Sequence, residues 1–315
     1  MNLFATVLTY PAPSANYRGE SELNRTVIQK VTDGRFDYPI ISPEAMRNAL
    51  REILARYGLP MNRRRLHDEE QLAVTFADYP DPERFADDFL FGYLVAASGK
   101  DRQKILGELK KAGRDKGFTF KRDSILRMNL AKGLEPYRHN AVFTQSPLSA
   151  EGSAYQNAAT SALLHRETAV TAFQYPLAIN LNDCQTRRDW ARALLRAIGE
   201  LSDVAGNHAR SYYEMAPASI VVRLTEQLVA GYDTYGFRID RKLGADEDTH
   251  RLPEVIDELL RADSVLPGRE FFIGGKIVRR MGDEAHAHLT SAGVTLDRDP
   301  RRLLQSVADR GLGGK

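Results

Sequence analysis

The first ten residues, MNLFATVLTY, carry no charged side chain and are apolar along most of their length. Written as a strand, they place Leu3, Ala5 and Val7 on one side and Phe4, Thr6 and Leu8 on the other. A strand that is apolar on both sides is typical of a sheet whose two faces are both covered. We therefore expect this segment at the centre of a sheet, with Pro11 and Pro13 ending it.

Strand and helix patterns alternate along the rest of the chain. Ser42 suits a helix N-cap, Pro43 suits the first turn, and Gly58 with Pro60 stops the helix. Its buried side would hold Met46, Leu50, Ile53, Leu54 and Tyr57. Other predicted elements are a helix from Asp81, a strand at 168–181 that Pro176 assigns to an edge or a bend, a helix at 187–201, a strand at 219–225 and a hairpin turning at Gly274-Gly275. This order, around a long insertion, predicts an α+β sheet of the ferredoxin or RRM type.

Charge and composition exclude several classes of protein. The 44 Lys and Arg nearly balance the 42 Asp and Glu, and 43% of the 315 residues are hydrophobic, which is ordinary for a globular protein. No apolar run approaches the ~20 residues of a transmembrane helix, and the N-terminus lacks the features of a signal peptide. We therefore expect a soluble, cytoplasmic protein. The single Cys184 excludes an internal disulfide and a multi-cysteine zinc site.

Motifs for catalysis or cofactor binding are weak. The sequence contains no GxxxxGK[ST], GxGxxG, CxxC, HExxH or GxSxG. His286 and His288 would point about 200° apart on a helix, so they cannot share a metal. His67-Asp68 resembles the core of a phosphohydrolase pair, but its further ligands cannot be identified. We expect no metal, no cofactor and no catalytic residue.

Basic residues give a stronger signal. Arg47 and Arg51 are four residues apart beside the apolar face of the predicted helix, where each guanidinium can bind a phosphate; pairing with nearby glutamates is the alternative. Residues 100–127 hold ten Lys or Arg against four Asp or Glu, with Phe118 and Phe120 interleaved, which favours nucleic acid over a plain solvated face. Two polar segments, the loop predicted at 14–26 and GNHARSYYEMAP, are also suited to binding a phosphate backbone; for the second, a plain surface turn is the alternative. Residues 143–161 have no helix or strand period and predict a projecting functional element.

Five blocks of sequence resemble the DevR-type backbone subunit of type I CRISPR effector complexes (Cascade), most like subtype I-B. The blocks are SANYRGESELNRTVIQKVTDGRFDYPIISPEAMRNALRE, DPERFADDFLFGYLVA, FKRDSILRMNLAKGLEPYRHNAVFTQSPLS, LLHRETAVTAFQYPLAIN and GNHARSYYEMAPASIVVRLT. They extend over residues 1–240 in the order found in that family. Beyond residue 240 the resemblance fades.

The resemblance implies an architecture and a set of crRNA-binding residues. An RRM-like palm would comprise residues 1–59 and 162–240, with a helical insertion (fingers or web) at 60–142, a thumb loop at 143–161 and a C-terminal region at 241–315. The basic run at 100–127 would meet target DNA. The implied RNA-binding residues are Asn16, Arg18, Arg25, Arg47, Arg51, His165, Arg166, Asn207, His208 and Arg210, with Leu148 as an apolar wedge in the thumb.

The function implied is that of a non-catalytic scaffold. Copies would oligomerise along crRNA and hold the guide ready to pair with target DNA. The expected partners are crRNA, target DNA, further copies of the chain, and other Cascade subunits (the foot subunit, the large subunit and the crRNA-processing endonuclease). An RNA-cleaving, type III-like subunit that uses Asp33 is the alternative, although Asp33-Gly34 is also an ordinary turn signal. A developmental regulator is a third reading, but the sequence has no helix-turn-helix signature of a DNA reader.

Overall fold

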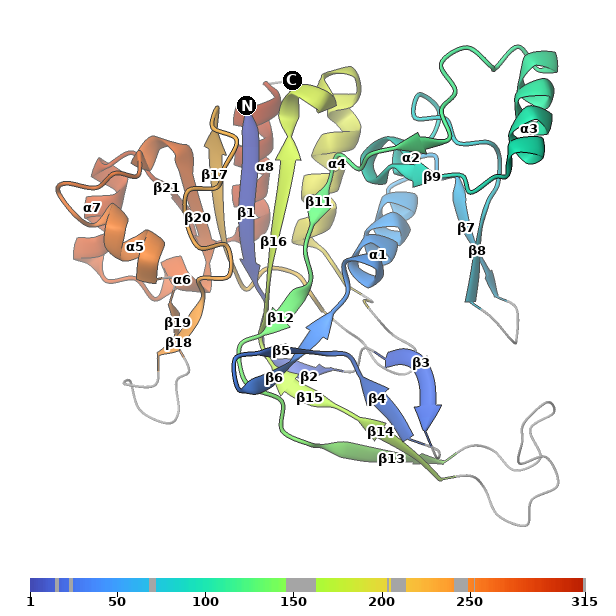
Figure 1. Cartoon of the computed structure of the whole chain (residues 1–315). Coiled ribbons are helices and arrows are strands. Elements are labelled where there is room, and N and C mark those ends of the chain that lie inside the picture. Colours follow the sequence, from blue (N-terminus) through green and yellow to red (C-terminus); the bar gives the residue numbers. More distant parts are fainter. Residues whose placement is uncertain are drawn as a thin grey trace.

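The computed structural model describes residues 1–14, 17–22, 25–67, 72–145, 163–202, 204, 214–240, 249–251 and 253–313. These residues form an α+β fold around a nine-stranded sheet in the order β21-β20-β17-β1-β16-β12-β6-β5, with β11 also paired to β16 (Figure 1). Its strands are β1 (Asn2–Leu8), β5 (Lys30–Asp33), β6 (Phe36–Ile41), β11 (Arg127–Met128), β12 (Ala131–Gly133), β16 (Phe173–Asn180), β17 (Ser219–Thr225), β20 (Phe271–Gly275) and β21 (Thr295–Asp297). The sheet is mixed, because β20 and β21 pair in parallel whereas β1 pairs antiparallel.

The N-terminal strand lies at the centre of this sheet, as its sequence predicts. β1 pairs along its full length with β16 on one side and β17 on the other. Leu3, Ala5 and Val7 join a large buried cluster on one face. On the opposite face, Leu8 belongs to a second cluster, and the Thr6 hydroxyl donates a hydrogen bond to the Thr234 carbonyl oxygen (3.0 Å).

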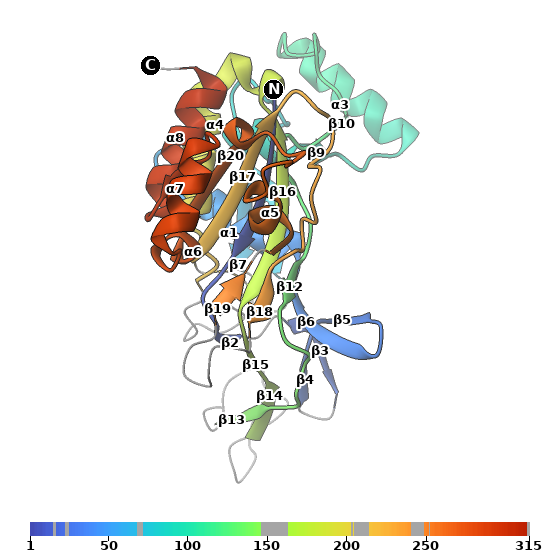
Figure 2. The same cartoon turned by 90° about the vertical axis from the view of Figure 1, so that its left-hand side faces the viewer.

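Four helices share the first cluster with the sheet: α1 (Pro43–Arg56), α2 (Ala86–Phe91), α4 (Arg188–Gly199) and α8 (Pro300–Leu312). Ser42 caps α1 by accepting a hydrogen bond from the Ala45 amide, and the four predicted aliphatic positions of this helix are buried. The second cluster packs α5 (Pro253–Leu259), α6 (Lys276–Arg279) and α7 (Asp283–Ser291) near β17 and β20. Figure 2 shows α4 and α8 on one side of the sheet and α5 on the other.

A second, four-stranded sheet lies at one end of the molecule, below the central sheet in both views (Figures 1 and 2). We call it the basal sheet; its order is β13-β14-β4-β3. Its strands are β3 (Tyr17–Glu22), β4 (Arg25–Ile28), β13 (Ala141–Gln145) and β14 (Leu163–Glu167). The remaining elements are β2 (Ala12–Ser14), β7 (Arg63–His67), β8 (Leu72–Phe76), β9 (Tyr93–Leu94), α3 (Gly99–Lys111), β10 (Lys121–Arg122), β15 (Ala169–Thr171), η1 (Leu181–Arg187), β18 (Arg238–Asp240), β19 (Thr249–Arg251) and η2 (Gly268–Glu270).

Two strand predictions are wrong for reasons of tertiary pairing. Pro176 lies in β16, which is internal and not at an edge. The Pro176 carbonyl oxygen accepts a hydrogen bond from the Asn129 amide, in the gap between β11 and β12, so the missing proline N–H falls where the ladder is already interrupted. The polar loop predicted at 14–26 instead supplies β3 and the first two residues of β4, because β4 pairs with the sequence-distant β14.

A predicted helix start and a predicted hairpin are also wrong. The helix predicted from Asp81 begins only at Ala86, because the Asp81 amide donates to the Asp88 carboxylate and the chain makes a turn there. The predicted Gly274-Gly275 hairpin is a strand-to-helix junction, in which α6 follows β20 directly. Gly275 has a φ of +92°, and an added Cβ would lie 2.2 Å from the Ala218 carbonyl oxygen. The glycine therefore permits close packing and not a hairpin turn.

Candidate nucleic-acid interface

Arg47 and Arg51 lie on the flank of α1, and both side chains are partly buried. The Arg47 Nη2 donates to the Leu126 carbonyl oxygen (3.2 Å), and the Arg51 Nη1 donates to the Asn48 side-chain oxygen (3.0 Å). The Arg51 guanidinium also lies over the Phe91 ring, 4.5 Å from its centroid. These contacts hold each side chain in place while using few of its five donors.

Both arginines retain unused hydrogen-bonding capacity. The Nε atoms of Arg47 and Arg51 are buried and have no hydrogen-bond partner among the described residues. Neither guanidinium forms an ion pair within 4 Å in this part of the chain, so the predicted alternative of pairing with a nearby glutamate is not observed there. A partly buried cation without a counterion is costly unless a ligand supplies one.

A third arginine, Arg63 at the start of β7, lies close enough to Arg47 and Arg51 for its positive charge to lower the pKa of both. Burial, followed by the like charges of Arg63 and Arg47, lowers the pKa of Arg51 to about 10. Burial also lowers the pKa of Arg47; the negative charge of Glu44 opposes this shift, and the like charge of Arg63 adds to it. We call Arg47, Arg51 and Arg63 the arginine cluster. The sequence signal that could have found its third member is the run Arg63-Arg64-Arg65, just after the stop of the first helix.

Two buried carboxylates near the cluster are occupied by other donors. Asp87 accepts hydrogen bonds from the amides of Asn62 (2.8 Å) and Arg63 (2.9 Å). Asp88 accepts from the Asn62 side chain (2.8 Å) and the Asp81 amide (2.9 Å). Their charges raise the pKa of Arg51, but burial and the neighbouring arginines outweigh them. Asp87 and Asn62 thus fix the backbone that carries Arg63.

Two more arginines stack on aromatic rings beside the cluster. The Arg122 guanidinium lies 5.3 Å from the Phe89 ring centroid, and that of Arg187 lies 4.8 Å from the Trp190 centroid. The Phe89 and Trp190 rings meet edge to face, with their centroids 5.7 Å apart. The Nε atoms of both arginines are buried without a hydrogen-bond partner among the described residues. Guanidinium groups held on rings with free N–H donors are well suited to binding phosphate.

His165 and Arg166, both predicted to bind RNA, lie on opposite faces of one strand. Both lie in β14, and successive side chains of a strand point to opposite faces. His165 pairs across the strands with Phe143, and their ring centroids are 4.3 Å apart. Arg166 shares the other face with Val142. These two residues therefore cannot contact one phosphate from the same face of the strand.

For the other predicted RNA-binding residues, the structure describes the backbone alone or does not describe the residue. Asn16, Leu148, Asn207, His208 and Arg210 lie outside the described residues. The backbone of Arg18 lies in β3, and that of Arg25 lies in β4 opposite His165.

Asp33, the alternative catalytic residue, lies at the end of β5 beside the turn to β6. It is exposed and forms an ion pair with Lys132 of β12, which lowers the pKa of Asp33. The Lys132 ammonium also lies over the Tyr38 ring, 4.3 Å from its centroid. Among the described residues, no group of three or more His, Cys, Asp and Glu side chains could hold a metal ion. Asp33 thus has a counterion and no neighbouring metal-binding group in that part of the chain.

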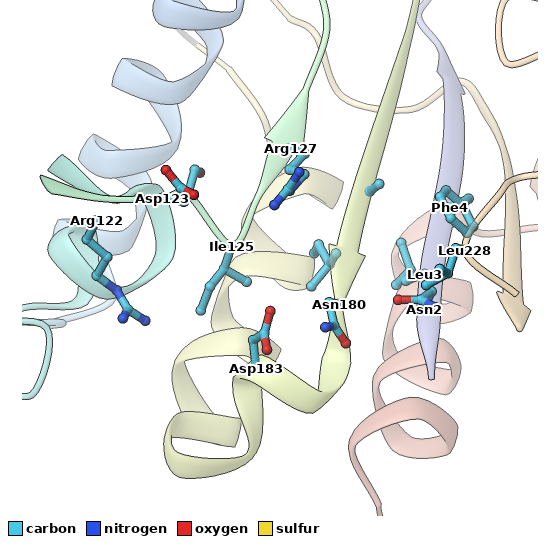
Figure 3. Close-up of a pocket in the computed structure, with 13 residues that line it drawn as sticks. Asn2, Leu3, Phe4, Arg122, Asp123, Ile125, Arg127, Asn180, Asp183 and Leu228 are labelled. Carbon is cyan, nitrogen blue, oxygen red and sulfur yellow. The ribbon is translucent and has the colours of Figure 1, made fainter. Parts of the chain in front are cut away.

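A pocket of about 590 Å³ opens on the sheet face between β1, β16 and the segment leading into β11 (Figure 3). Asn180 and Asp183 face Ile125 and Arg127 across it. Its rim mixes arginine with aspartate, and its floor is partly apolar. The pocket therefore lacks the single sign of charge that marks the arginine cluster. Within the described residues, no helix is long and apolar enough to cross a bilayer.

Comparisons with known proteins agree with the sequence blocks. The chain is 27% identical over 304 residues to a protein of Myxococcus xanthus (strain DK1622) described as CRISPR-associated protein Cas7/Cst2/DevR, covering 93% of this chain and 92% of that protein. No protein-family model matches. Two solved structures share the fold, each with a TM-score of 0.59: a CRISPR RNA-guided surveillance complex chain (13% identity, 98% of this chain and 99% of that one) and a pre-nicking surveillance complex chain (12%, 99% and 100%). The relative confirms the resemblance to DevR-type proteins, whereas subtype I-B stays a prediction.

Proposed function

We propose that this chain is a non-catalytic backbone subunit of a CRISPR RNA-guided effector complex and binds the sugar-phosphate backbone of crRNA. The observation that carries this proposal is the arginine cluster: partly buried guanidinium groups, two of them with a buried, unused Nε donor, and no ion pair within 4 Å in the described part of the chain. An RNA phosphate would supply the missing negative charge and accept the free N–H groups. The full-length similarity to a Cas7/Cst2/DevR protein supports the same assignment.

In this proposal the protein recognises the backbone shape of the guide RNA, and base pairing between guide and target provides the sequence specificity. Contacts to phosphate and 2′-hydroxyl groups would hold the guide in an ordered form without selecting its bases, which remain free to pair with target DNA. Because the guide is ordered beforehand, hybridisation with the target would lose less conformational entropy. Further copies of the chain would bind successive stretches of the same RNA, next to the other Cascade subunits.

In this proposal each predicted segment of the chain has its own binding role. An RRM-like palm would combine residues 1–59 and 162–240, and would present α1 with its arginines to the guide. The insertion at 60–142 contains α3, where Lys100, Lys104, Lys110 and Lys111 are exposed, a surface suited to the phosphates of target DNA. The thumb at 143–161, including Leu148, would reach towards the next copy.

The test starts from the protein purified with its neighbouring subunits. Co-purified nucleic acid would be extracted and sequenced, and we expect short RNAs of defined length with repeat-derived ends. The double variant Arg47→Ala/Arg51→Ala should lose this RNA, whereas Arg310→Ala, a matched change at an exposed position of α8, should keep it. Heterogeneous cellular RNA in the wild type, or equal RNA in both variants, would contradict the proposal. The Asp33 alternative has no comparable support, because its carboxylate is engaged by Lys132.

A further inference from the structure

A buried aspartate, Asp88 of α2, has one carboxylate oxygen without a hydrogen-bond partner among the described residues. The residue is 1% exposed. Its Oδ2 atom accepts hydrogen bonds from the Asn62 side chain (2.8 Å) and the Asp81 amide (2.9 Å), whereas its Oδ1 atom is buried and accepts none in that part of the chain. Hydrogen bonds to both oxygens stabilise a carboxylate, and burial without them favours the neutral acid. The Oδ1 atom of Asp88 is therefore suited to hold a proton.

The neighbouring Asp87 is equally buried but differs in its hydrogen bonds. Its Oδ1 atom accepts the Asn62 amide (2.8 Å) and its Oδ2 atom accepts the Arg63 amide (2.9 Å), so both oxygens have a donor. Burial, with a smaller contribution from the like charge of Asp87, raises the pKa of Asp88, although its two hydrogen bonds oppose the rise. Of this pair of carboxyl groups, Asp88 is thus the one that can gain a proton without losing a hydrogen bond.

Asp88 lies within the electrostatic reach of the arginine cluster. The positive charge of Arg63 opposes the burial-driven rise in the pKa of Asp88, and the negative charge of Asp88 opposes the burial-driven fall in the pKa of Arg51. Further charged groups on the segments packed around α2 are Asp78 and Asp81, which pair with Arg84 or Arg114, and Arg122 and Arg187, which lie over the Phe89 and Trp190 rings. A phosphate bound to the cluster would offset its positive charge and so favour the protonated form of Asp88.

We propose that Asp88 takes up a proton when RNA binds to the arginine cluster, so that the affinity for RNA rises as the pH falls. This inference rests on the proposed function and adds a proton-binding group to the same site. Binding and protonation favour each other by the same factor, because the coupling between two ligands is reciprocal. The phosphate raises the pKa of Asp88 in the complex above its value in the free protein. The affinity is therefore lowest while Asp88 is ionised, rises as the pH falls through the pKa of the complex, and levels off below the pKa of the free protein.

The experiment measures the protons taken up when a short oligo(U) RNA binds the full chain. Calorimetric titrations in buffers of different ionisation enthalpy give this number, and repeats between about pH 5 and 8 give the affinity profile. The wild type should take up protons and bind about three- to tenfold more tightly at the acidic end. Asp88→Asn resembles the protonated acid and keeps an oxygen for the donors of Asn62 and Asp81. At neutral pH it should bind about three- to tenfold more tightly than the wild type, and it should take up fewer protons.

Asp283→Asn is the matched control, because it makes the same change at an exposed position of α7 and should keep the proton uptake of the wild type. Equal uptake in Asp88→Asn and the wild type would overturn the role of Asp88 while the proposed function stands. If Asp88→Asn does not fold, NMR titration of the Asp88 carboxyl in the wild type replaces it: the midpoint should rise when RNA binds, and an unchanged midpoint would overturn the inference. A wild type that binds no RNA would instead refute the proposed function.

Discussion

Replacing Arg51 by methionine should stabilise the free protein and weaken its RNA binding. The pKa of Arg51 is lowered from 12.5 to about 10, first by burial and then by the like charge of Arg63. At 1.36 kcal/mol per unit, the charged form costs about 3 kcal/mol relative to the unfolded chain. The folded pKa is the lower one, so this cost is present throughout neutral pH and is relieved only as the pH rises above about 10.

Methionine keeps the length of the side chain and its contact with the Phe91 ring, but loses the charge and the hydrogen bond to Asn48. Because its donor is charged, that bond contributes about 1.5–3 kcal/mol. The remaining gain is at most about 1.5 kcal/mol, which corresponds to a rise in Tm of up to about 2 °C for a chain of this size. Arg310→Met, at an exposed position of α8, should leave Tm nearly unchanged and serves as the control.

Binding should change in the opposite direction. Loss of one charge-assisted phosphate contact should weaken binding to a short single-stranded RNA by about tenfold or more. It should also reduce the slope of log K against log salt by about 0.7. Fluorescence anisotropy at several salt concentrations, together with thermal unfolding of the RNA-free protein, measures both effects. A lower Tm in Arg51→Met would identify Arg51 as a structural anchor, and an unchanged salt slope would refute its contact with phosphate.

Three other substitutions probe separate parts of the chain. Arg223→Met removes a guanidinium that is 3% exposed and paired with Glu270. Because this leaves the Glu270 carboxylate unpaired, we expect the free energy of unfolding to fall by about 2–3 kcal/mol, measured as a lower urea midpoint. An unchanged midpoint would contradict this role. Gly92→Ala places a Cβ 2.3 Å from the Arg122 carbonyl oxygen at a φ of +64°, so Tm should fall by several degrees, and equal Tm values would disprove the close approach. Asp33→Asn should bind RNA like the wild type, and neither should cleave complementary RNA with divalent cations; cleavage that disappears in the variant would restore a catalytic role.

Elements with complete local signals could be predicted from the sequence. The cap at Ser42, the glycine and proline after the helix, and the spacing of its aliphatic residues define α1 without reference to the rest of the chain. The doubly apolar N-terminal strand likewise indicated its central place, because only neighbours on both sides could cover it. Local rules succeed here because the residues that decide the structure are adjacent in sequence.

Elements defined by distant partners could not be predicted in this way. Pro176 is tolerated inside a sheet because the strands beside it separate at Asn129, about fifty residues earlier in the chain. Nothing near Pro176 in the sequence indicates that gap. Gly275 looks like a hairpin glycine, but its role is the close approach of the Ala218 backbone. The same dipeptide would fit either geometry, and tertiary packing decides between them.

The candidate site shows the same division. Helical spacing places Arg47 and Arg51 on one flank of α1. The position of Arg63 depends on a tertiary contact that cannot be predicted from the neighbouring sequence. Asp87 accepts the amides of Asn62 and Arg63, and so fixes Arg63 from 24 residues further along the chain. A buried carboxylate that is occupied by backbone donors organises the positive charges but leaves none of them with an ion pair in the described chain. That arrangement costs stability unless an anion binds, and this is why we expect stability and RNA binding to change in opposite directions at Arg51.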